Sequence, residues 1–164
     1  MGKFYSTKTW GNDRGLSCCF RQWRSHHSHC SLLHGYSIGV KVIFECDSLD
    51  ERNWVQDFGS LKRFKEWLEH MFDHTVLIAE DDPHLDSFMK LQEIGAIRDG
   101  ANTALLDLRI VPAVGCERFA QLAYDTLSNM LDEDRAAGKA LNNTVRVKSV
   151  EVFEHGANSA IYEG

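Results

Sequence analysis

The chain is organised around the stretch His29-Cys30-Ser31-Leu32-Leu33-His34-Gly35-Tyr36, which leads directly into an alternating apolar run. In that run every second residue from Ile38 to Cys46 is apolar, whereas Lys41 and Glu45 lie in the opposite phase. Alternation of this kind is typical of a strand with one buried face, so we expect a long strand over 34–46. His34 and Tyr36 share the phase of the apolar positions. Their side chains should therefore point to one side of the sheet where the strand begins.

Length and composition limit the classes of protein to which the chain can belong. Its 164 residues are enough for a single domain with a core, and we expect one domain over 1–164. A formal net charge of -6 argues against binding to duplex nucleic acid, and the sequence contains no apolar run long enough to span a membrane. The N-terminus does not resemble a signal peptide, and the five cysteines lack the regular spacing of a disulfide framework. We therefore expect a cytoplasmic protein with reduced thiols.

The remaining periodicities predict the other elements. Apolar residues at helical spacing predict helices over about 60–72 and 116–134, and Asp82-Pro83 is typical of the start of a short helix that includes Leu91. Residues 1–15 are expected to form an irregular lead-in. Further strands are expected at 16–23, 105–111, 145–152, with a bulge near Ser149, and 157–162.

The order of these elements indicates the fold class. Helices lie between two pairs of strands, which predicts an α+β fold with a four-stranded antiparallel sheet and helices on one face. Such a sheet has exposed edges, and a neighbouring subunit often covers edges of this kind. We therefore expect a homo-oligomer.

Cys30 is the first candidate catalytic residue. A thiol becomes a nucleophile or a base when nearby cations lower its pKa, and His29, His34 and Arg24 lie close in sequence. The plainer alternative is that Cys30 is a small buried apolar residue, as most free cysteines are.

Two further groups lie far downstream. Asp73 could orient or charge the imidazole of His74, although a histidine at a helix end is also favoured by the helix dipole alone. Glu154, eight residues before Tyr162, could bind an amidine-like N–C–N edge through both carboxylate oxygens.

A set of ordered motifs runs through these residues and carries a resemblance. The motifs are Cys30-x-x-x-His34-Gly35, Asp57-Phe58-x-x-Leu61-Lys62, Phe72-Asp73-His74, Glu117 within Gly115-Cys116-Glu117-Arg118-Phe119-Ala120, and Glu154 with Ala160-Ile161-Tyr162. Together, over about 16–162, they resemble the 6-pyruvoyl-tetrahydropterin synthase / 6-carboxy-tetrahydropterin synthase family.

The resemblance implies a fold, an assembly and a reaction. It implies the tunnelling fold, in which subunits join their sheets into a barrel and form active sites at subunit interfaces; a hexamer of two trimers is one such assembly. It implies a lyase that acts on a pterin, typically 7,8-dihydroneopterin triphosphate. Cys30 matches the catalytic cysteine, Asp73 and His74 match the proton-relay pair, and Glu154 matches the carboxylate that binds the pterin ring, with Glu117 as a second substrate-binding residue. Cys30 favours the pyruvoyl or carboxy branch, and we expect the carboxy branch and queuosine biosynthesis.

The expected zinc site is where the sequence departs from the family. The family usually offers three histidines, but Phe20 and Tyr36 occupy two of these positions and His34 alone remains. Zinc requires three or four nitrogen, sulfur or oxygen ligands. We expect His34 and His29 as ligands, with His27 or Cys18 as alternatives, although histidines in a loop are more often simply solvated. The segment 76–114 is also longer than is usual in the family.

Three functional hypotheses remain open at this point. The chain could be a pterin-forming lyase with a rebuilt metal site, a diverged enzyme that binds a pterin or purine without a metal, or a non-catalytic homologue. Retention of Cys30, Asp73, His74 and Glu154 argues against the third hypothesis.

Overall fold

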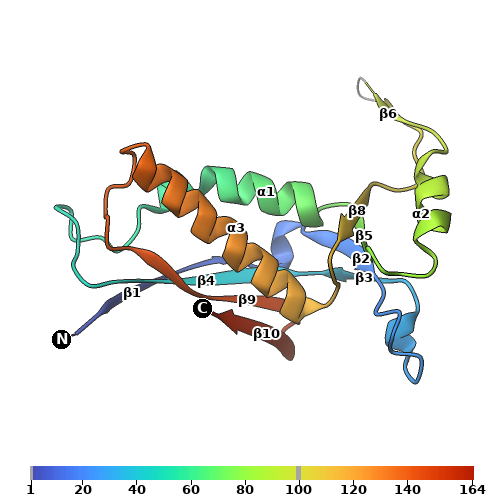
Figure 1. The fold of residues 1–164 in the computed structure, drawn as a ribbon, viewed down its shortest axis with the longest axis horizontal. Helices are drawn as coiled ribbons and strands as arrows, with labels where there is room; N and C mark the ends of the chain where they lie inside the picture. Colours follow the sequence, from blue (N-terminus) through green and yellow to red (C-terminus); the bar gives the residue numbers. More distant parts are fainter. Residues whose placement is uncertain (1, 99–100) are drawn as a thin grey trace.

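The structure, a computed structural model, describes residues 2–98 and 101–164. Its main sheet contains four antiparallel strands in the order β1 (Phe4–Trp10), β4 (Gly39–Cys46), β9 (Arg146–His155) and β10 (Asn158–Glu163). Helices α1 (Lys62–Phe72) and α3 (Cys116–Ala136) cover one face of this sheet (Figure 1). The expected α+β class, with a four-stranded antiparallel sheet and helices on one face, is confirmed.

The first strand of the main sheet is not the expected one. The prediction of an irregular lead-in over 1–15 is wrong, because β1 pairs with β4 from Phe4 opposite Cys46 to Trp10 opposite Val40. Trp10 is the one buried residue of β1, and its other residues are exposed or half-buried. An edge strand of this composition has no apolar face that alternation could reveal.

A second, smaller sheet lies at one end of the main sheet (Figure 1). Its strands follow the order β3 (His34–Ser37), β2 (Ser17–Phe20), β5 (Thr75–Ala79) and β8 (Leu108–Val111). β2 is antiparallel to β3, whereas β2, β5 and β8 are parallel to one another. The strand predicted at 16–23 is therefore β2 in this second sheet, and the strand predicted over 34–46 is divided at Ile38 into β3 and β4.

The segment 76–114 completes the second sheet and extends away from it. The predicted short helix is α2 (Leu85–Gln92), which begins beyond Asp82. Asp82 nevertheless accepts the backbone N–H of His84 at 2.8 Å and so caps the turn before the helix. Two short strands, β6 (Ile97–Arg98) and β7 (Ala101–Asn102), pair antiparallel and project beyond α2 (Figure 1). No helix among the described residues is long and apolar enough to cross a membrane.

The predicted bulge near Ser149 is confirmed. Ile43 of β4 pairs with Ser149, but the next residue, Phe44, pairs with Val147, so Lys148 is the extra residue. The bulge reverses the phase of β9, and both Val147 and Val150 are therefore buried on the helix side.

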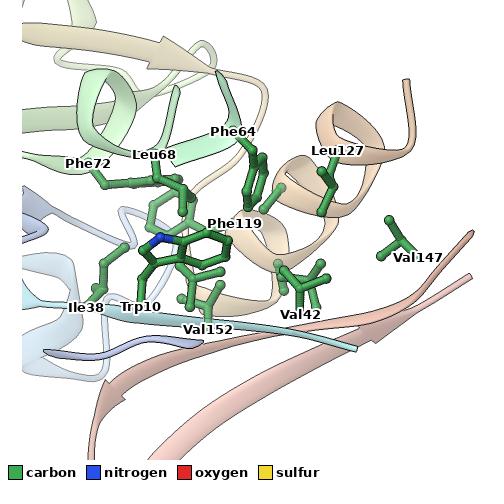
Figure 2. Packing of buried hydrophobic residues seen from close by; sticks show 14 of the residues in the cluster. Trp10, Ile38, Val42, Phe64, Leu68, Phe72, Phe119, Leu127, Val147 and Val152 are labelled. Atoms are coloured by element: carbon green, nitrogen blue, oxygen red, sulfur yellow. The ribbon is translucent and has the colours of Figure 1, made fainter. Parts of the chain in front are cut away.

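The core lies between the main sheet and the two long helices, as Figure 2 shows. Trp10 packs edge-on against Phe64 of α1 with ring centroids 5.4 Å apart. Phe119 of α3 is fully buried, and its ring lies 5.3 Å from Phe72 of α1 and 5.0 Å from Phe20 of β2. Phe119 therefore joins the two-helix layer to the second sheet.

Replacing Phe119 with alanine tests this joint. We expect Phe119→Ala to lower the free energy of unfolding by about 3–5 kcal/mol, because the buried ring leaves a cavity between three elements. Phe58→Ala, at a phenylalanine that is 42% exposed, should cost much less. Urea unfolding followed by circular dichroism measures both, and equal losses would contradict the role given to Phe119.

Candidate active site

Cys30 lies on a short turn of 3₁₀-helix, η2 (His29–Ser31), within the long connection between β2 and β3. The Ser28 hydroxyl accepts the backbone N–H of Cys30 at 3.2 Å and so caps this turn. The Cys30 carbonyl accepts the backbone N–H of Gln22 at 2.8 Å. These two contacts hold the half-buried thiol beyond the Phe20 end of β2.

His34 and Tyr36 point to the same side of β3, as the phase of the sequence predicts. The Nε2 atom of His34 lies 2.7 Å from the Tyr36 hydroxyl, and its Nδ1 atom lies 2.6 Å from the carbonyl oxygen of Leu32. A carbonyl can only accept, so we assign the proton of a neutral His34 to Nδ1. Nε2 is then the acceptor for the Tyr36 hydroxyl, and both ring nitrogens are engaged.

Asn12 ties β3 to the far end of β9. Its side-chain amide donates to the carbonyl of Ser37 at 2.6 Å and to the carbonyl of Glu154 at 3.5 Å. Asn12 fits closely against Gly39, where an added Cβ would lie 3.0 Å from the Asn12 Oδ1 atom. The end of β3, at Ser37, and the end of β9 are therefore fixed next to each other.

Glu154 faces two groups whose pKa values it raises. Burial first, then the negative charge of Glu154, raises the pKa of Tyr36, and Cys30 and Cys116 contribute in the same direction. Burial, then Glu154 and Glu117, raises the pKa of the Cys116 thiol to about 12, with a hydrogen bond to Glu154 adding to the effect. Tyr36 and Cys116 are therefore neutral near pH 7, and both can serve as hydrogen-bond donors.

Cys30, Tyr36, Cys116 and Glu154 thus form one cluster where the second sheet, the start of α3 and the end of β9 meet. The predicted residue Glu117 is exposed beside it, in the first turn of α3. No role was predicted for Cys116, and Tyr36 was expected only to stand in place of a metal ligand. The position of Cys116 next to Glu117 in its motif was the available signal.

Asp73 and His74 form the expected pair but lie away from this cluster in space. The Nδ1 atom of His74 is 2.7 Å from Oδ1 of Asp73, and the His74 side chain is 85% exposed. The backbone N–H of His74 donates to the carbonyl of Ser17, at the start of β2, whereas Gln22, beyond the end of β2, contacts Cys30. At about 3.3 Å per strand residue, the two groups lie roughly 15 Å apart along β2. A single chain does not bring them together.

The expected metal ligands do not fit a zinc site within one chain. Phe20 offers no donor atom, both nitrogens of His34 are engaged, and His29 is exposed on η2. Burial, followed by Cys19 and Cys116, raises the pKa of Cys18 to about 12, so this alternative ligand is a neutral thiol. Over 2–98 and 101–164, no group of three or more His, Cys, Asp or Glu side chains could hold a metal ion. The described residues of one chain therefore do not fit a zinc ion.

Comparisons with known proteins agree with the fold and with the motifs. The family described as 6-pyruvoyl tetrahydropterin synthase matches residues 12–164. The 6-carboxy-5,6,7,8-tetrahydropterin synthase of Aquifex aeolicus is 29% identical over 137 residues, which cover 82% of this chain and 75% of that protein. The enzyme of the same name from Rickettsia conorii is 30% identical over 61 residues, 37% of this chain and 44% of that protein.

Solved structures show the same fold at lower identity. An uncharacterised protein from Wolinella succinogenes superposes with a TM-score of 0.77 at 20% identity, covering 100% of this chain and 99% of that one. The 6-pyruvoyl tetrahydropterin synthase of Plasmodium falciparum gives a TM-score of 0.65 at 12% identity, covering 99% and 98%. The match of the family to residues 12–164 decides the assignment. The chain belongs to the 6-pyruvoyl tetrahydropterin synthase family.

Proposed function

We propose that this chain is a pterin-forming lyase of the 6-carboxy-tetrahydropterin synthase type, acting on 7,8-dihydroneopterin triphosphate. The observation that carries the proposal is the convergence of Cys30 and Glu154 on Tyr36, in a chain of this family. The names of the Aquifex and Rickettsia relatives support the 6-carboxy product. A cytoplasmic location and a place in queuosine biosynthesis are part of the same proposal.

Glu154 and Cys116 supply the proposed binding contacts for the pterin. A carboxylate can accept two hydrogen bonds from the N–C–N edge of the ring, which presents donors in a matching geometry. The neutral Cys116 thiol lies close enough to Glu154 for the carboxylate to raise its pKa, and it can serve as a hydrogen-bond donor beside that carboxylate. Glu117, exposed in the same turn of α3, is the proposed second contact to the pterin.

Cys30 is the proposed proton acceptor. Rearranging the side chain of the pterin requires breaking a C–H bond on a carbon next to a hydroxyl or carbonyl group. We assign Cys30 to accept that proton on one face of the substrate and His74, oriented by Asp73, to exchange a proton on another. Tyr36 places a neutral hydroxyl near Cys30; its proton is donated to His34, so its oxygen can accept a hydrogen bond from a substrate hydroxyl.

This assignment requires two copies of the chain. Asp73 and His74 lie at the opposite end of β2 from Cys30, and the His74 imidazole is exposed. β1 and β10 form the two edges of the main sheet and could pair with the edges of neighbouring copies. We therefore propose a homo-oligomer, such as a hexamer of two trimers, in which His74 of one copy faces Cys30 of the next.

The second candidate is a protein that binds a pterin or a purine, either as a diverged enzyme or without catalysis. It is favoured by one observation, the replacement of two expected zinc ligands by Phe20 and Tyr36. Such a protein would keep the Glu154 contact but would not convert 7,8-dihydroneopterin triphosphate.

Activity measurements on single variants test the roles of Cys30 and Glu154. Cys30→Ala should lower kcat by about 100-fold or more, because a positioned proton acceptor is lost. Glu154→Gln should mainly raise KM, because an amide offers one acceptor oxygen in place of two. Acetaldehyde release and chromatography of the pterin product report the reaction. His26→Ala, at an exposed residue of the same loop, is the matched control, and an unchanged rate in Cys30→Ala would remove Cys30 from the mechanism.

Mixing two inactive variants tests the shared site. Cys30→Ala and His74→Ala should each be inactive alone but should recover about a quarter of parental activity when co-refolded in equal amounts, since random pairing restores that fraction of interfaces. Recovery of no activity in mixed oligomers, verified by sedimentation, would place Cys30 and His74 in separate functions.

Metal analysis tests the departure at the zinc position. We expect dialysed protein to hold well below one zinc per chain and to keep its activity with a chelator present. The double variant Phe20→His with Tyr36→His, which supplies three histidines beside one another, should gain zinc. A parent protein with one zinc per chain that is lost in His34→Ala would instead support a rebuilt metal site.

A further inference from the structure

Arg21 and Asp82 form a buried ion pair immediately beyond the ends of two parallel strands. Arg21 follows β2, and Asp82 follows β5 by three residues. The Nε and Nη2 atoms of Arg21 donate to the two carboxylate oxygens of Asp82 at 2.8 and 3.3 Å. The Asp82 side chain is 0% exposed and that of Arg21 is 18% exposed. This is a two-pronged contact between a guanidinium and a carboxylate that solvent does not screen.

The third nitrogen of Arg21 reaches the loop that carries Cys30. Its Nη1 atom donates to the carbonyl oxygen of Ser31 at 3.1 Å. One residue earlier, the carbonyl of Cys30 itself accepts the backbone N–H of Gln22. The η2 turn is therefore fastened to the end of β2 at two consecutive residues, Cys30 and Ser31.

The planar guanidinium is needed for this arrangement. It presents separate donors to Asp82 and to Ser31 in a rigid fork, which a single ammonium group does not provide. Asp82 in turn fixes the rotation of the guanidinium, because its two oxygens engage two of the three nitrogens. Asp82 also accepts the backbone N–H of His84, so the turn after β5 holds the carboxylate itself in place.

We propose that Asp82, acting through Arg21, is a positioning residue that fixes the position of the Cys30 thiol relative to Glu154. The turn 80–84, part of the long segment 76–114, thereby supports the loop that bears the proposed proton acceptor. This inference rests on the proposed function, because it assigns a role in the reaction to the geometry of Cys30.

The neighbouring carboxylate provides a matched control. Asp81 pairs with Arg24 at 2.8 Å, but its side chain is 49% exposed and that of Arg24 is 73% exposed. Arg24 and Trp23 are its side-chain partners, at the surface of the same loop. Asp81→Asn therefore removes the same charge from the same turn without touching the Arg21–Ser31 contact.

Steady-state kinetics form the first arm of the test. Asp82→Asn should lower kcat by about 10- to 100-fold and change KM little, because misplacement of a reacting group by about 1 Å slows the chemical step rather than binding. Asp81→Asn should keep kcat within about twofold of the parent, since exposed ion pairs contribute little. Equal effects of the two substitutions on kcat, or a change confined to KM, would overturn the proposal.

Alkylation of Cys30 by iodoacetamide, followed by peptide mass mapping, forms the second arm. Asp82→Asn should alkylate Cys30 about fivefold faster or more than the parent, because a released η2 turn exposes the half-buried thiol. Cys18 and Cys116, with pKa values near 12, should stay unmodified and thus report that the protein remains folded. This arm needs no substrate: if the parent has no lyase activity, the proposed function fails while the positioning role is still decided here.

Arg21→Lys covers the case in which Asp82→Asn does not fold. Lysine keeps a positive charge beside the buried Asp82 but cannot bond to Asp82 and to Ser31 with the geometry of a fork. We expect this variant to fold with a Tm close to that of the parent and still to show faster Cys30 alkylation and lower kcat. A folded Arg21→Lys protein with parental kcat and parental Cys30 alkylation would overturn the proposal.

Discussion

The packing of Phe119 against Phe20 and Phe72 is the interaction on which the rest of the structure depends. It joins α3, α1 and the second sheet at one point, with the three rings in edge or tilted contacts. Phe119 lies one helical turn after Cys116, so the same contact fixes where the first turn of α3 lies relative to β2 and β3. Because Glu154 lies beside Cys116, the position of the candidate site follows directly from this aromatic joint.

The sequence predicted those parts of the fold whose burial follows one simple period. The helices near 60–72 and 116–134 and the alternation in β4 are of this kind, and all are present. The bulge in β9 was predictable because it interrupts an otherwise regular alternation. β1 was missed because an edge strand with one buried residue carries no apolar phase. β2 and β8 lie within strands predicted at 16–23 and 105–111, but their place in a second sheet was not predicted. β5 itself was missed, because a run of five residues can be read as a strand, a turn or part of a helix.

The candidate site was predictable in its residue types but not in its grouping. Cys30 and Glu154 were expected from the family resemblance, and the structure places both beside Tyr36. The separation of His74 from Cys30 could not be read from the sequence, because it depends on β5 lying parallel to β2 rather than antiparallel. In the parallel arrangement the residues before β5 lie at the start of β2, whereas the loop after β2 lies at the other end. The role of Asp82 was also only partly predictable. The sequence identifies it as a capping residue but cannot show that its carboxylate also binds Arg21.

The replacement of zinc ligands by Phe20 and Tyr36 changes what holds this part of the site together. A metal ion would fix three side chains by coordination, each with one nitrogen directed at a common point. Here Phe20 packs on Phe119 and lies 5.3 Å from the ring of Tyr36, and one hydrogen bond joins Tyr36 to His34. Position 20 has thereby become part of the core, and its side chain is fixed by burial rather than by coordination. Rigidity at these positions therefore does not require a metal. The aromatic group does not supply positive charge. Under the proposed function, a developing negative charge would therefore have to be stabilised by neutral hydrogen-bond donors or by groups from the proposed neighbouring copy.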